Sequence, residues 1–425
     1  MTSTDRTILV SGASIAGPAL AYWLRRLGFT PTVVERAPRL RDGGYAIDVR
    51  GAAVEVADRM GLLPQIRRAR TGMRALSVVG ADGHRRATLD VARLGDDTAA
   101  RDAELMRGHL SRILYAATEH DVEYVFDDSV TALEETPDGV HVTFENAAPR
   151  TFGLVVGADG LHSTVRRIAF GPEERFRRDL GNYISIFGVP NHLGLDREAM
   201  LHNTPGRLAG LYSAAPHTGR VEPPGPGEET AAGPNPRAQA ILAFSSRREI
   251  PFDHRDTAAH KQILRTVFAD VGWEAPRLLR HLADTTDFYF DSISQIRMDH
   301  WSRGRTVLVG DAAHCPSPLS GQGTSLALVG AYVLACELAA ADGDHRAAFT
   351  RYEQRMRGYV AQNQALVSSG GGILVPATRA RIWLRDQMMR LAALLPVVAR
   401  LGGGIQRAAN AVELPDHRVL EGHAS

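Results

Sequence analysis

Cysteine and lysine are the scarcest residues in this chain of 425 residues. The two cysteines, Cys315 and Cys336, are too few for a disulfide framework or a cysteine-based metal site, which favours a reducing, cytoplasmic location. Lys261 is the only lysine, yet lysine and arginine together balance aspartate and glutamate at 49 to 48. The net charge of +1 provides no broad basic surface, so we expect no nucleic-acid partner.

Long apolar segments are also missing. No uninterrupted apolar run approaches the roughly 20 residues that span a bilayer. Residues 1–10 lack the basic start and apolar stretch of a secretory signal. The 16 histidines show no spacing typical of a metal site. We therefore expect neither membrane association nor a bound metal, and we expect a monomer or a weak homodimer.

The length suits two domains, or one large domain with an insertion, and leaves room for a cleft between them. A strand pattern over Thr7–Ser11, a helix pattern ending near Leu27 and a second strand over Thr30–Glu35 predict a βαβ unit. Two later apolar strands, within Phe152–Gly160 and Thr306–Asp311, predict that the chain returns twice to the same parallel sheet.

Between these returns the pattern changes to alternating strands, including Tyr183–Phe187 and Ala240–Phe244, which is typical of an antiparallel sheet. We predict an α/β fold in which a Rossmann-like nucleotide-binding domain is interrupted by an antiparallel β-sheet domain. The expected boundaries are 1–177 and 297–365 for the two parts of the first domain, 178–296 for the inserted domain, and 366–425 for a C-terminal helical segment.

The C-terminal segment contains an amphipathic run over Ala380–Leu401. We expect this run to form a helix that packs across the two domains and closes the cleft between them. A helix lying on a membrane surface is the alternative, because its arginines suit lipid headgroups as well as solvent.

The sequence Gly12-Ala13-Ser14-Ile15-Ala16-Gly17 lies where the first strand turns into the first helix. Small residues there leave backbone amides and the positive end of the helix dipole free to face a pyrophosphate. Ser14 stands where the middle glycine of the dinucleotide-binding pattern is expected, so the match is to a variant. Glu35 ends the second strand, where it could accept hydrogen bonds from the hydroxyls of an adenosine ribose.

Two further motifs place a carboxylate after an apolar strand. Asp159 lies in the sequence GADGLHSTVR, residues 157–166. Asp311 lies in GDAAH, residues 310–314, which is followed by PLSGQG at residues 318–323. Ligands bind at the carboxyl ends of the strands in open parallel sheets, so three such motifs in this order predict a dinucleotide site.

With these motifs, the chain resembles the FAD-dependent aromatic hydroxylases of the para-hydroxybenzoate hydroxylase type, the group A flavoprotein monooxygenases. Residues 43–51, GGYAIDVRG, and the C-terminal layout look most like the branch with the tetracycline-inactivating monooxygenases. The resemblance covers the layout of residues 5–365 and is specific at the motifs. It implies an FAD-binding domain of the glutathione reductase type, with NADPH or NADH as a transient co-substrate. In this family a flavin hydroperoxide passes one oxygen atom of O2 to the substrate.

The resemblance also implies which residues hold the cofactor. The turn and the second strand would hold the ADP half of FAD through Gly12, Ser14, Ile15, Ala16, Gly17, Glu35 and Arg36. Arg107 would contact the flavin side, Asp159 would serve FAD and NAD(P)H, and Asp311 would serve the ribityl and pyrophosphate region. Beside the isoalloxazine ring would pass Pro318, Gly321, Gln322, Gly323 and Thr324.

Asp48 and Arg50 would lie near the ring or the substrate. Two residues depart from the family's pattern: Ser325 stands where many relatives have asparagine, and Gly330 where many have aspartate. Both lie in a helix predicted from about Gly323 to Ala341, so the contacts of this helix with the ring stay open.

Two residues near the third motif could be either structural or reactive. We expect His314 to be a structural or flavin-edge residue rather than a general base. We expect Cys315 to pack rather than to act as a redox nucleophile. No side chain is predicted to be catalytic by itself, because the flavin performs the chemistry.

The substrate site is predicted only from strand positions. Phe187, Tyr212, Phe244 and either Phe288 or Tyr289, all on predicted strands, could line a pocket facing the flavin or could equally belong to a core. The family implies an aromatic or polyketide-like phenol as substrate, with hydroxylation as the leading outcome and epoxidation or Baeyer-Villiger insertion still open. A flavin-dependent oxidase or dehydrogenase, and a non-catalytic FAD- or ligand-binding protein, are the alternatives.

Overall fold

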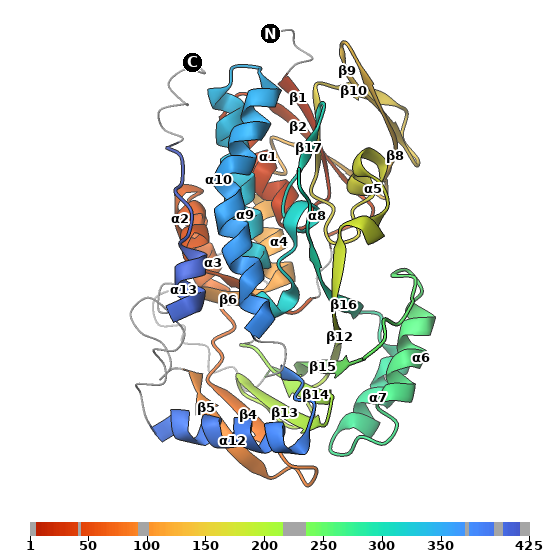
Figure 1. The fold of residues 1–425 in the computed structure, drawn as a ribbon, viewed down its shortest axis with the longest axis vertical. Helices are drawn as coiled ribbons and strands as arrows, with labels where there is room; N and C mark the ends of the chain where they lie inside the picture. Colours follow the sequence, from red (N-terminus) through yellow and green to blue (C-terminus); the bar gives the residue numbers. More distant parts are fainter. Residues whose placement is uncertain are drawn as a thin grey trace.

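A computed structural model of the chain describes residues 6–40, 44–91, 102–215, 235–369, 374–394 and 403–416. Figure 1 shows two parts, one above the other. The long strands β12 (Arg177–Pro190) and β16 (Phe288–Ile296) pair with each other and run from the upper part into the lower one.

The upper part is built on a six-stranded sheet with the order β17-β18-β11-β1-β2-β7. Its strands are β1 (Thr7–Ser11), β2 (Thr30–Glu35), β7 (Glu123–Phe126), β11 (Leu154–Gly157), β17 (Ser302–Arg303) and β18 (Thr306–Leu308). Strand β1 pairs in parallel with β2 and β11, and β11 pairs in parallel with β18. The βαβ start and the two predicted returns to the same sheet are confirmed.

Helices cover this sheet and fill the upper core. The first helix of the βαβ unit, α1 (Ala16–Arg26), packs on α9 (Gly323–Ala340), where the rings of Trp23 and Tyr332 lie 4.7 Å apart. By length and composition α9 could cross a membrane, but 83% of it is buried inside the protein, so its apolar character is that of a core helix. The other helices here are α2 (Ala52–Arg59), α3 (Leu63–Arg68), α4 (Arg107–Ala116), α5 (Thr164–Phe170), α8 (Asp311–His314), α10 (His345–Ala365) and α13 (Gly403–Ala409).

Two small sheets complete the upper part. Strands β8 (Val130–Thr136), β9 (Gly139–Phe144) and β10 (Arg150–Phe152) form an antiparallel sheet. Strands β3 (Ala46–Val49) and β6 (Ala103–Met106) form a two-stranded antiparallel ribbon.

The lower part is a seven-stranded sheet with the order β16-β12-β15-β14-β13-β4-β5. Its remaining strands are β4 (Ala75–Val79), β5 (Arg85–Asp90), β13 (Glu198–Thr204), β14 (Arg207–Tyr212) and β15 (Arg237–Ser245). The hairpin β4–β5 comes from residues 75–90, which the sequence boundaries assign to the first domain. It joins this sheet through a parallel pairing of β4 with β13, and such a long-range pairing leaves no local signal in the sequence.

Two helices, α6 (Thr257–Val267) and α7 (Ala275–Asp284), enclose a second hydrophobic core on one face of the lower sheet. The C-terminal helix α12 (Arg379–Leu394) packs on β5 and β13. Arg385 on this helix donates to the Asn203 side chain of β13. The described part of the predicted run Ala380–Leu401 thus packs on the lower sheet and does not bridge the two parts, while residues 395–401 lie outside the described residues.

Candidate functional site

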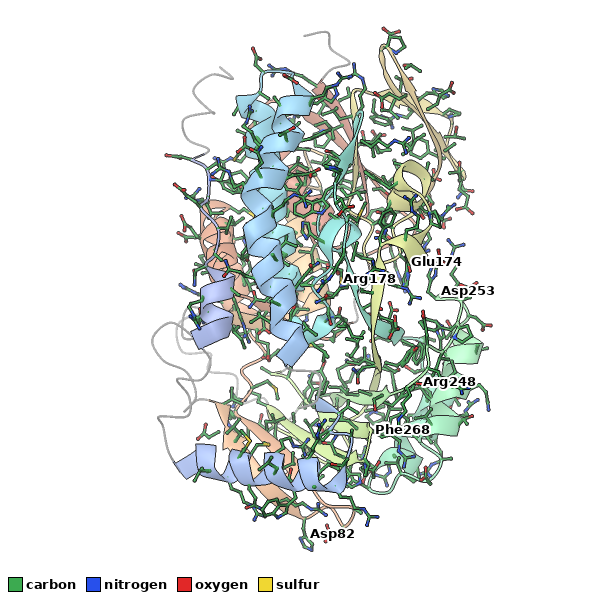
Figure 2. The ribbon with its side chains drawn as sticks, viewed as in Figure 1. Asp82, Glu174, Arg178, Arg248, Asp253 and Phe268 are labelled. Carbon is green, nitrogen blue, oxygen red and sulfur yellow. The ribbon has the colours of Figure 1, made fainter. Side chains whose placement is uncertain are left out.

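A cavity of about 770 Å³ lies between the two parts, within the size range of small-molecule and cofactor sites. Its walls are the turn after β1, the loops after β11 and β18, the β3–β6 ribbon and one face of the lower sheet. The three sequence motifs therefore open onto one space, as the order of the parallel strands predicts. Figure 2 shows the side chains that fill the region between the upper and lower parts.

The glycine turn is shaped by contacts of the chain with itself. Gly12 has φ +110°, and a Cβ there would lie 2.5 Å from the Ala158 carbonyl oxygen. A Cβ at Gly17 would overlap the carbonyl oxygen of Gly12. Gly12 lines the cavity, but Gly17 does not appear among its lining residues. Gly17 therefore packs α1 against the turn, and Gly12 lets the turn approach the end of β11.

Glu35 braces the same turn from the end of β2. Its Oε2 accepts a hydrogen bond from the Ala13 amide at 2.8 Å, and its Oε1 accepts one from the Ala37 amide at 2.9 Å. Glu35 and the adjacent Arg36 both line the cavity. The carboxylate thus fixes the turn while facing the space predicted for a ribose.

Arg107, the first residue of α4, reaches across the cavity to the turn. Its Nη2 donates to Ser14 Oγ at 2.8 Å, and its backbone amide donates to the Tyr45 carbonyl at 3.0 Å. Both Arg107 and Ser14 line the cavity. The serine in place of the middle glycine therefore has a partner, which the motif alone does not indicate.

The two motif aspartates have different surroundings. Asp159 accepts hydrogen bonds from the Ser163 hydroxyl and from the amides of Thr164 and Val165, so it fixes the start of α5. Burial raises the pKa of Asp159. Burial also raises the pKa of Asp311, against the opposing effects of the Cys315 thiol and the Arg107 cation. Both carboxyl groups line the cavity.

The loop before α9 holds its own shape. Ser317 has φ +89°, its Oγ accepts from the Leu319 amide at 3.3 Å, and its carbonyl accepts from the Ser320 hydroxyl at 2.8 Å. The Gln322 amide donates to Ser320 Oγ, while the Gln322 side chain is fully buried and does not line the cavity. The cavity is lined by the other predicted loop residues, Pro318, Gly321, Gly323 and Thr324.

The β3 strand runs beside this loop. Asp48 pairs with Arg50 at 2.9 Å, and a Cβ at Gly321 would lie 3.2 Å from Asp48 Oδ2. The Arg50 amide donates to Ser325 Oγ at 3.1 Å, so the serine that departs from the family pattern ties β3 to α9. Arg50 itself does not line the cavity.

Gly330, the second departure, packs α9 closely against its neighbours. A Cβ there would lie 3.3 Å from Val309 and 3.5 Å from Met356 of α10. Gly330 does not line the cavity. An aspartate at this position would place a carboxylate in the core, so the departure affects packing rather than the lining of the cavity.

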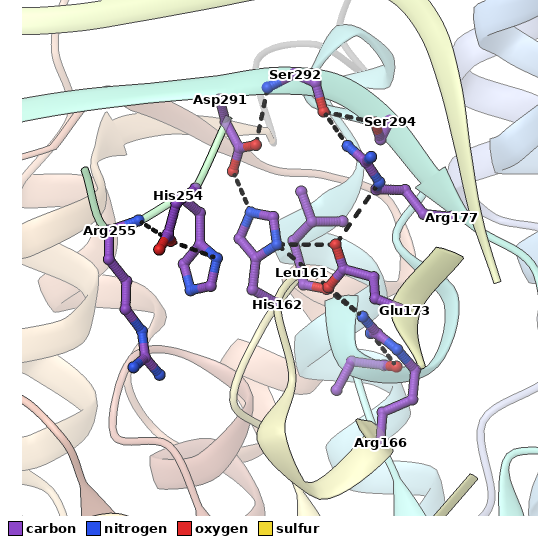
Figure 3. A network of polar contacts seen from close by, with 12 residues as sticks. Leu161, His162, Arg166, Glu173, Arg177, His254, Arg255, Asp291, Ser292 and Ser294 are labelled. Carbon is purple, nitrogen blue, oxygen red and sulfur yellow. Dashed lines mark hydrogen bonds and ion pairs between the residues drawn. The ribbon is translucent and has the colours of Figure 1, made fainter. Parts of the chain in front are cut away.

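A histidine network, not identified from the sequence, is shown in Figure 3, and its members His162, His254 and Asp291 line the same cavity. His162 contacts Glu173 through Nδ1 and Asp291 of β16 through Nε2, both at 3.0 Å, and its ring stacks on His254 at 4.3 Å. Burial alone would lower the pKa of His162, but the hydrogen bonds and charges of Asp291 and Glu173 raise it to about 9. A cation thus links the second motif to the strand that enters the lower sheet.

Three of the aromatic residues that were predicted as possible lining residues lie on the opposite face of the lower sheet. Phe187 and Phe244 are buried in the core with α6 and α7, and Phe288 packs against that core. Tyr212 and Tyr289 line the cavity. Because side chains alternate along a strand, the cavity wall receives the neighbouring aliphatic residues Ile184, Ile186 and Ile241 instead. Alternation identifies the two faces, but only the packing of α6 and α7 shows which one is covered.

His314 and Cys315 do not carry reactive features. His314 is fully buried, it does not line the cavity, and burial lowers its pKa to about 3. Cys315 lines the cavity, but burial raises the pKa of its thiol well above the ordinary value. A protonated thiol is a poor nucleophile, so both side chains are in keeping with structural roles.

The residues around the cavity fit FAD. The glycine turn sits at the start of α1, where the positive end of the helix dipole favours a pyrophosphate. Arg107 adds a cation directly at this turn. The loop before α9, whose shape is held by its own hydrogen bonds, lines the same cavity through Pro318, Gly321 and Gly323.

Comparisons with known proteins agree with this geometry. The family model described as FAD binding domain matches residues 5–186 and 242–364. A flavin-dependent monooxygenase from Legionella longbeachae is 40% identical over 366 residues, covering 85% of this chain and 88% of that protein. A flavin-dependent monooxygenase from an unknown prokaryotic organism is also 40% identical, covering 97% and 99%.

Solved structures show the same fold along nearly the whole chain. The crystal structure of tetracycline destructase Tet(55) matches with a TM-score of 0.79 and 38% identity, covering 98% of this chain and 100% of that one. The structure of tetracycline destructase Tet(51) matches with a TM-score of 0.80 and 34% identity, covering 97% and 99%. The predicted fold class and family are thereby confirmed: this chain belongs to the FAD-dependent monooxygenases that carry the FAD binding domain.

Proposed function

We propose that this monooxygenase uses NADPH or NADH and O2 to hydroxylate a flat aromatic or polyketide-like molecule. The observation that supports this proposal best is the continuity of the cavity, which joins the FAD-type motifs to an apolar chamber against one face of the lower sheet. FAD, when bound, would accept a hydride from the nicotinamide and would activate O2. The chain's own residues hold the cofactor, orient the substrate and exclude water.

The cofactor-binding residues that we propose act through contacts already formed in the protein. Arg107 and Ser14 are linked to each other, and Glu35 is linked to the turn, so their positions are fixed before a ligand arrives. Prearranged donors cost little reorganisation when negative charge must be stabilised.

The loop before α9 would favour the reduced, negatively charged cofactor. Gly323 begins an 18-residue helix, and the positive end of its dipole is directed toward the loop at Pro318–Gly321. The amides of residues 319–322 all donate within the loop, so the helix dipole rather than free loop amides would provide this effect. A dipole acts more strongly beside a cavity inside a protein than in bulk solvent.

The substrate would lie between this loop and the lower sheet. Ile184, Ile186 and Ile241 present an aliphatic wall that suits a flat apolar molecule and keeps water from the reacting carbon. The Tyr212 oxygen accepts a hydrogen bond from the Ala46 amide, and no described residue accepts its phenolic proton, so this proton could be donated to a substrate oxygen. Because the 38% and 34% identical solved relatives are tetracycline destructases, a tetracycline is one candidate substrate.

The test is oxidation of NADPH and NADH by FAD-loaded protein under ¹⁸O2, with a panel of phenols, polyketides and a tetracycline. We expect a product that is heavier by one labelled oxygen atom. Oxidation that yields only hydrogen peroxide with every compound would favour an oxidase instead. No oxidation of either nicotinamide would favour a ligand-binding protein.

A further inference from the structure

The wall of the cavity formed by β3, β4, β6 and β12–β15, here called the substrate chamber, has two chemically different sides. The lower sheet contributes aliphatic side chains, among them Ile184, Leu208 and Ile241. The β3–β6 ribbon contributes Asp48 and Glu104, which are direct cross-strand partners. Among the described residues of the chamber these two are the only charged ones, so an apolar face lies opposite an acidic edge.

The two carboxyl groups are not equivalent. Asp48 has a counter-ion, because Arg50 Nη2 lies 2.9 Å from its Oδ1. Glu104 has no such partner: of the residues that the structure describes, only the Thr71 hydroxyl donates to its side chain, through Oε1. The Thr71 amide also donates to the Glu104 carbonyl at 2.8 Å, which fixes the backbone. Glu104 Oε2 is therefore the acceptor left open in the chamber.

A partly buried carboxylate without a cation is costly, because the apolar surroundings replace water without replacing its stabilisation of the charge. Burial accordingly raises the pKa of Glu104, against the lowering effect of the Thr71 hydrogen bond, while the nearby charges of Asp48 and Arg50 act in opposite directions. A ligand ammonium group at Oε2 would supply the missing charge and would retain the Thr71 hydrogen bond.

Building on the proposed function, we propose that Glu104 determines substrate specificity, and that the substrate is a flat apolar molecule carrying a basic amine at one edge. The ammonium pairs with Glu104 Oε2 while the flat body lies against the aliphatic wall. Glu104 faces Asp48 across the ribbon, and Asp48 lies beside Gly321. Anchoring at Glu104 therefore places the molecule next to the loop that we propose to hold the flavin ring.

The experiment measures binding rather than turnover. FAD-loaded protein is titrated with matched pairs of aryl methylamines and aryl methanols with one, two and three rings, and flavin fluorescence reports Kd. We expect the wild-type protein to bind the amine of at least one pair about 10-fold tighter than the alcohol. In Glu104→Gln the amine should lose about 10- to 100-fold in affinity and the alcohol less than about 3-fold, as for loss of a charge-assisted hydrogen bond.

Two variants control for structural effects. Glu123→Gln removes an exposed carboxylate on β7, outside the cavity, and should leave both affinities unchanged. Glu104→Asp keeps the charge on a shorter side chain and should restore part of the amine preference. FAD content of each variant shows whether the upper part is intact.

The proposal is overturned if alcohols bind as tightly as amines in every pair, if no amine binds, or if Glu104→Gln retains the preference for amines. Its failure is separable from that of the proposed function. Incorporation of ¹⁸O into a neutral phenol by Glu104→Gln at the wild-type rate would leave a monooxygenase without amine recognition. Glu104-dependent amine binding without a labelled product would support the specificity site and count against oxygenation.

Discussion

Arg107 Nη2 donates a 2.8 Å hydrogen bond to Ser14 Oγ, joining the start of α4 to the turn after β1 across 93 positions of sequence. The contact explains why a serine can replace the middle glycine of a dinucleotide turn. The hydroxyl is small enough to leave the turn open, and it holds the Arg107 cation at this turn, whereas the family resemblance implied a contact of Arg107 on the flavin side.

Arg107→Ala should weaken FAD binding by about 10- to 100-fold, as expected for loss of a charged hydrogen-bonding partner. The fold should survive, because the α4 backbone keeps its bond to the Tyr45 carbonyl. Isothermal titration of the apoprotein with FAD gives the affinity. Arg25→Ala, an exposed change in the last turn of α1, is the control. Unchanged FAD affinity in Arg107→Ala would remove this residue from the proposed site.

Gly12→Val should prevent correct assembly of the upper sheet, and the protein should be colourless. From the sequence, the valine would be expected to clash with the pyrophosphate. In the structure the new Cβ would already clash with the Ala158 carbonyl, before any cofactor binds. The defect should therefore appear in the apoprotein as a lowered melting temperature. Gly358→Ala on the exposed face of α10 has no atom within 4 Å and should gain about 0.5–1 kcal/mol. An apoprotein of Gly12→Val as stable as wild type would contradict this reason.

The glycine turn and the strands beside it show what a local sequence motif can predict. Strands β1 and β2 were predicted at their observed bounds, since a buried parallel strand is a continuous apolar run ended by turn residues. The cavity-lining positions of Ser14, Glu35 and Asp311 follow from the same local pattern.

Contacts between distant segments could not be predicted in this way. His162 was visible only as part of a motif, while its partner Asp291 and the stacked His254 come from elements more than 90 residues away in the chain. The sequence predicted aromatic residues at positions of the cavity wall where the structure has aliphatic ones. This error also comes from contacts between distant segments, because only the position of α6 and α7 decides which face of the lower sheet is core.

Phe187→Ala tests that assignment. Phe187 is almost fully buried against α6 and α7, so the change should cost about 3–5 kcal/mol of stability without selectively changing the affinity for any ligand. Ile186→Ala, on the adjacent position facing the cavity, should instead weaken binding of flat apolar ligands. Thermal unfolding and the fluorescence titration separate the two effects. The assignment is wrong if Phe187→Ala is as stable as the wild-type protein but changes ligand affinity.

Removal of residues 374–425 should destabilise the lower sheet, and it also removes α13 from its contact with α10 in the upper part. Val375 is buried with Leu208 and Ala243, and the Gly206 amide donates to the Pro376 carbonyl at 2.9 Å. Without these residues that face of the sheet is exposed to water, so the melting temperature should fall and the protein should aggregate. The control is Leu384→Gln, which changes a side chain on α12 that is already 53% exposed. A shortened protein that stays soluble and equally stable would exclude a packing role for α12.

The His162 network predicts how stability depends on pH. The pKa of His162 in the folded protein is raised to about 9, above the ordinary value of 6.5, so the folded state holds the proton more tightly than the unfolded state. The resulting stabilisation is fully present below pH 6.5 and is lost as the pH rises through about 9. Because the histidine is mostly buried between Asp291 and Glu173, the loss should reach about 1–3 kcal/mol.

Urea unfolding of wild-type protein and His162→Gln at pH 7, 8, 9 and 10 isolates this contribution. The variant should be less stable at pH 7, and the difference between the two proteins should shrink toward pH 10, because only the wild type has a proton to lose at this position. His300→Gln changes a histidine that is 80% exposed and should follow the wild-type curve. If the wild-type and His162→Gln curves run parallel, the cation between Asp291 and Glu173 does not stabilise the junction between the two parts.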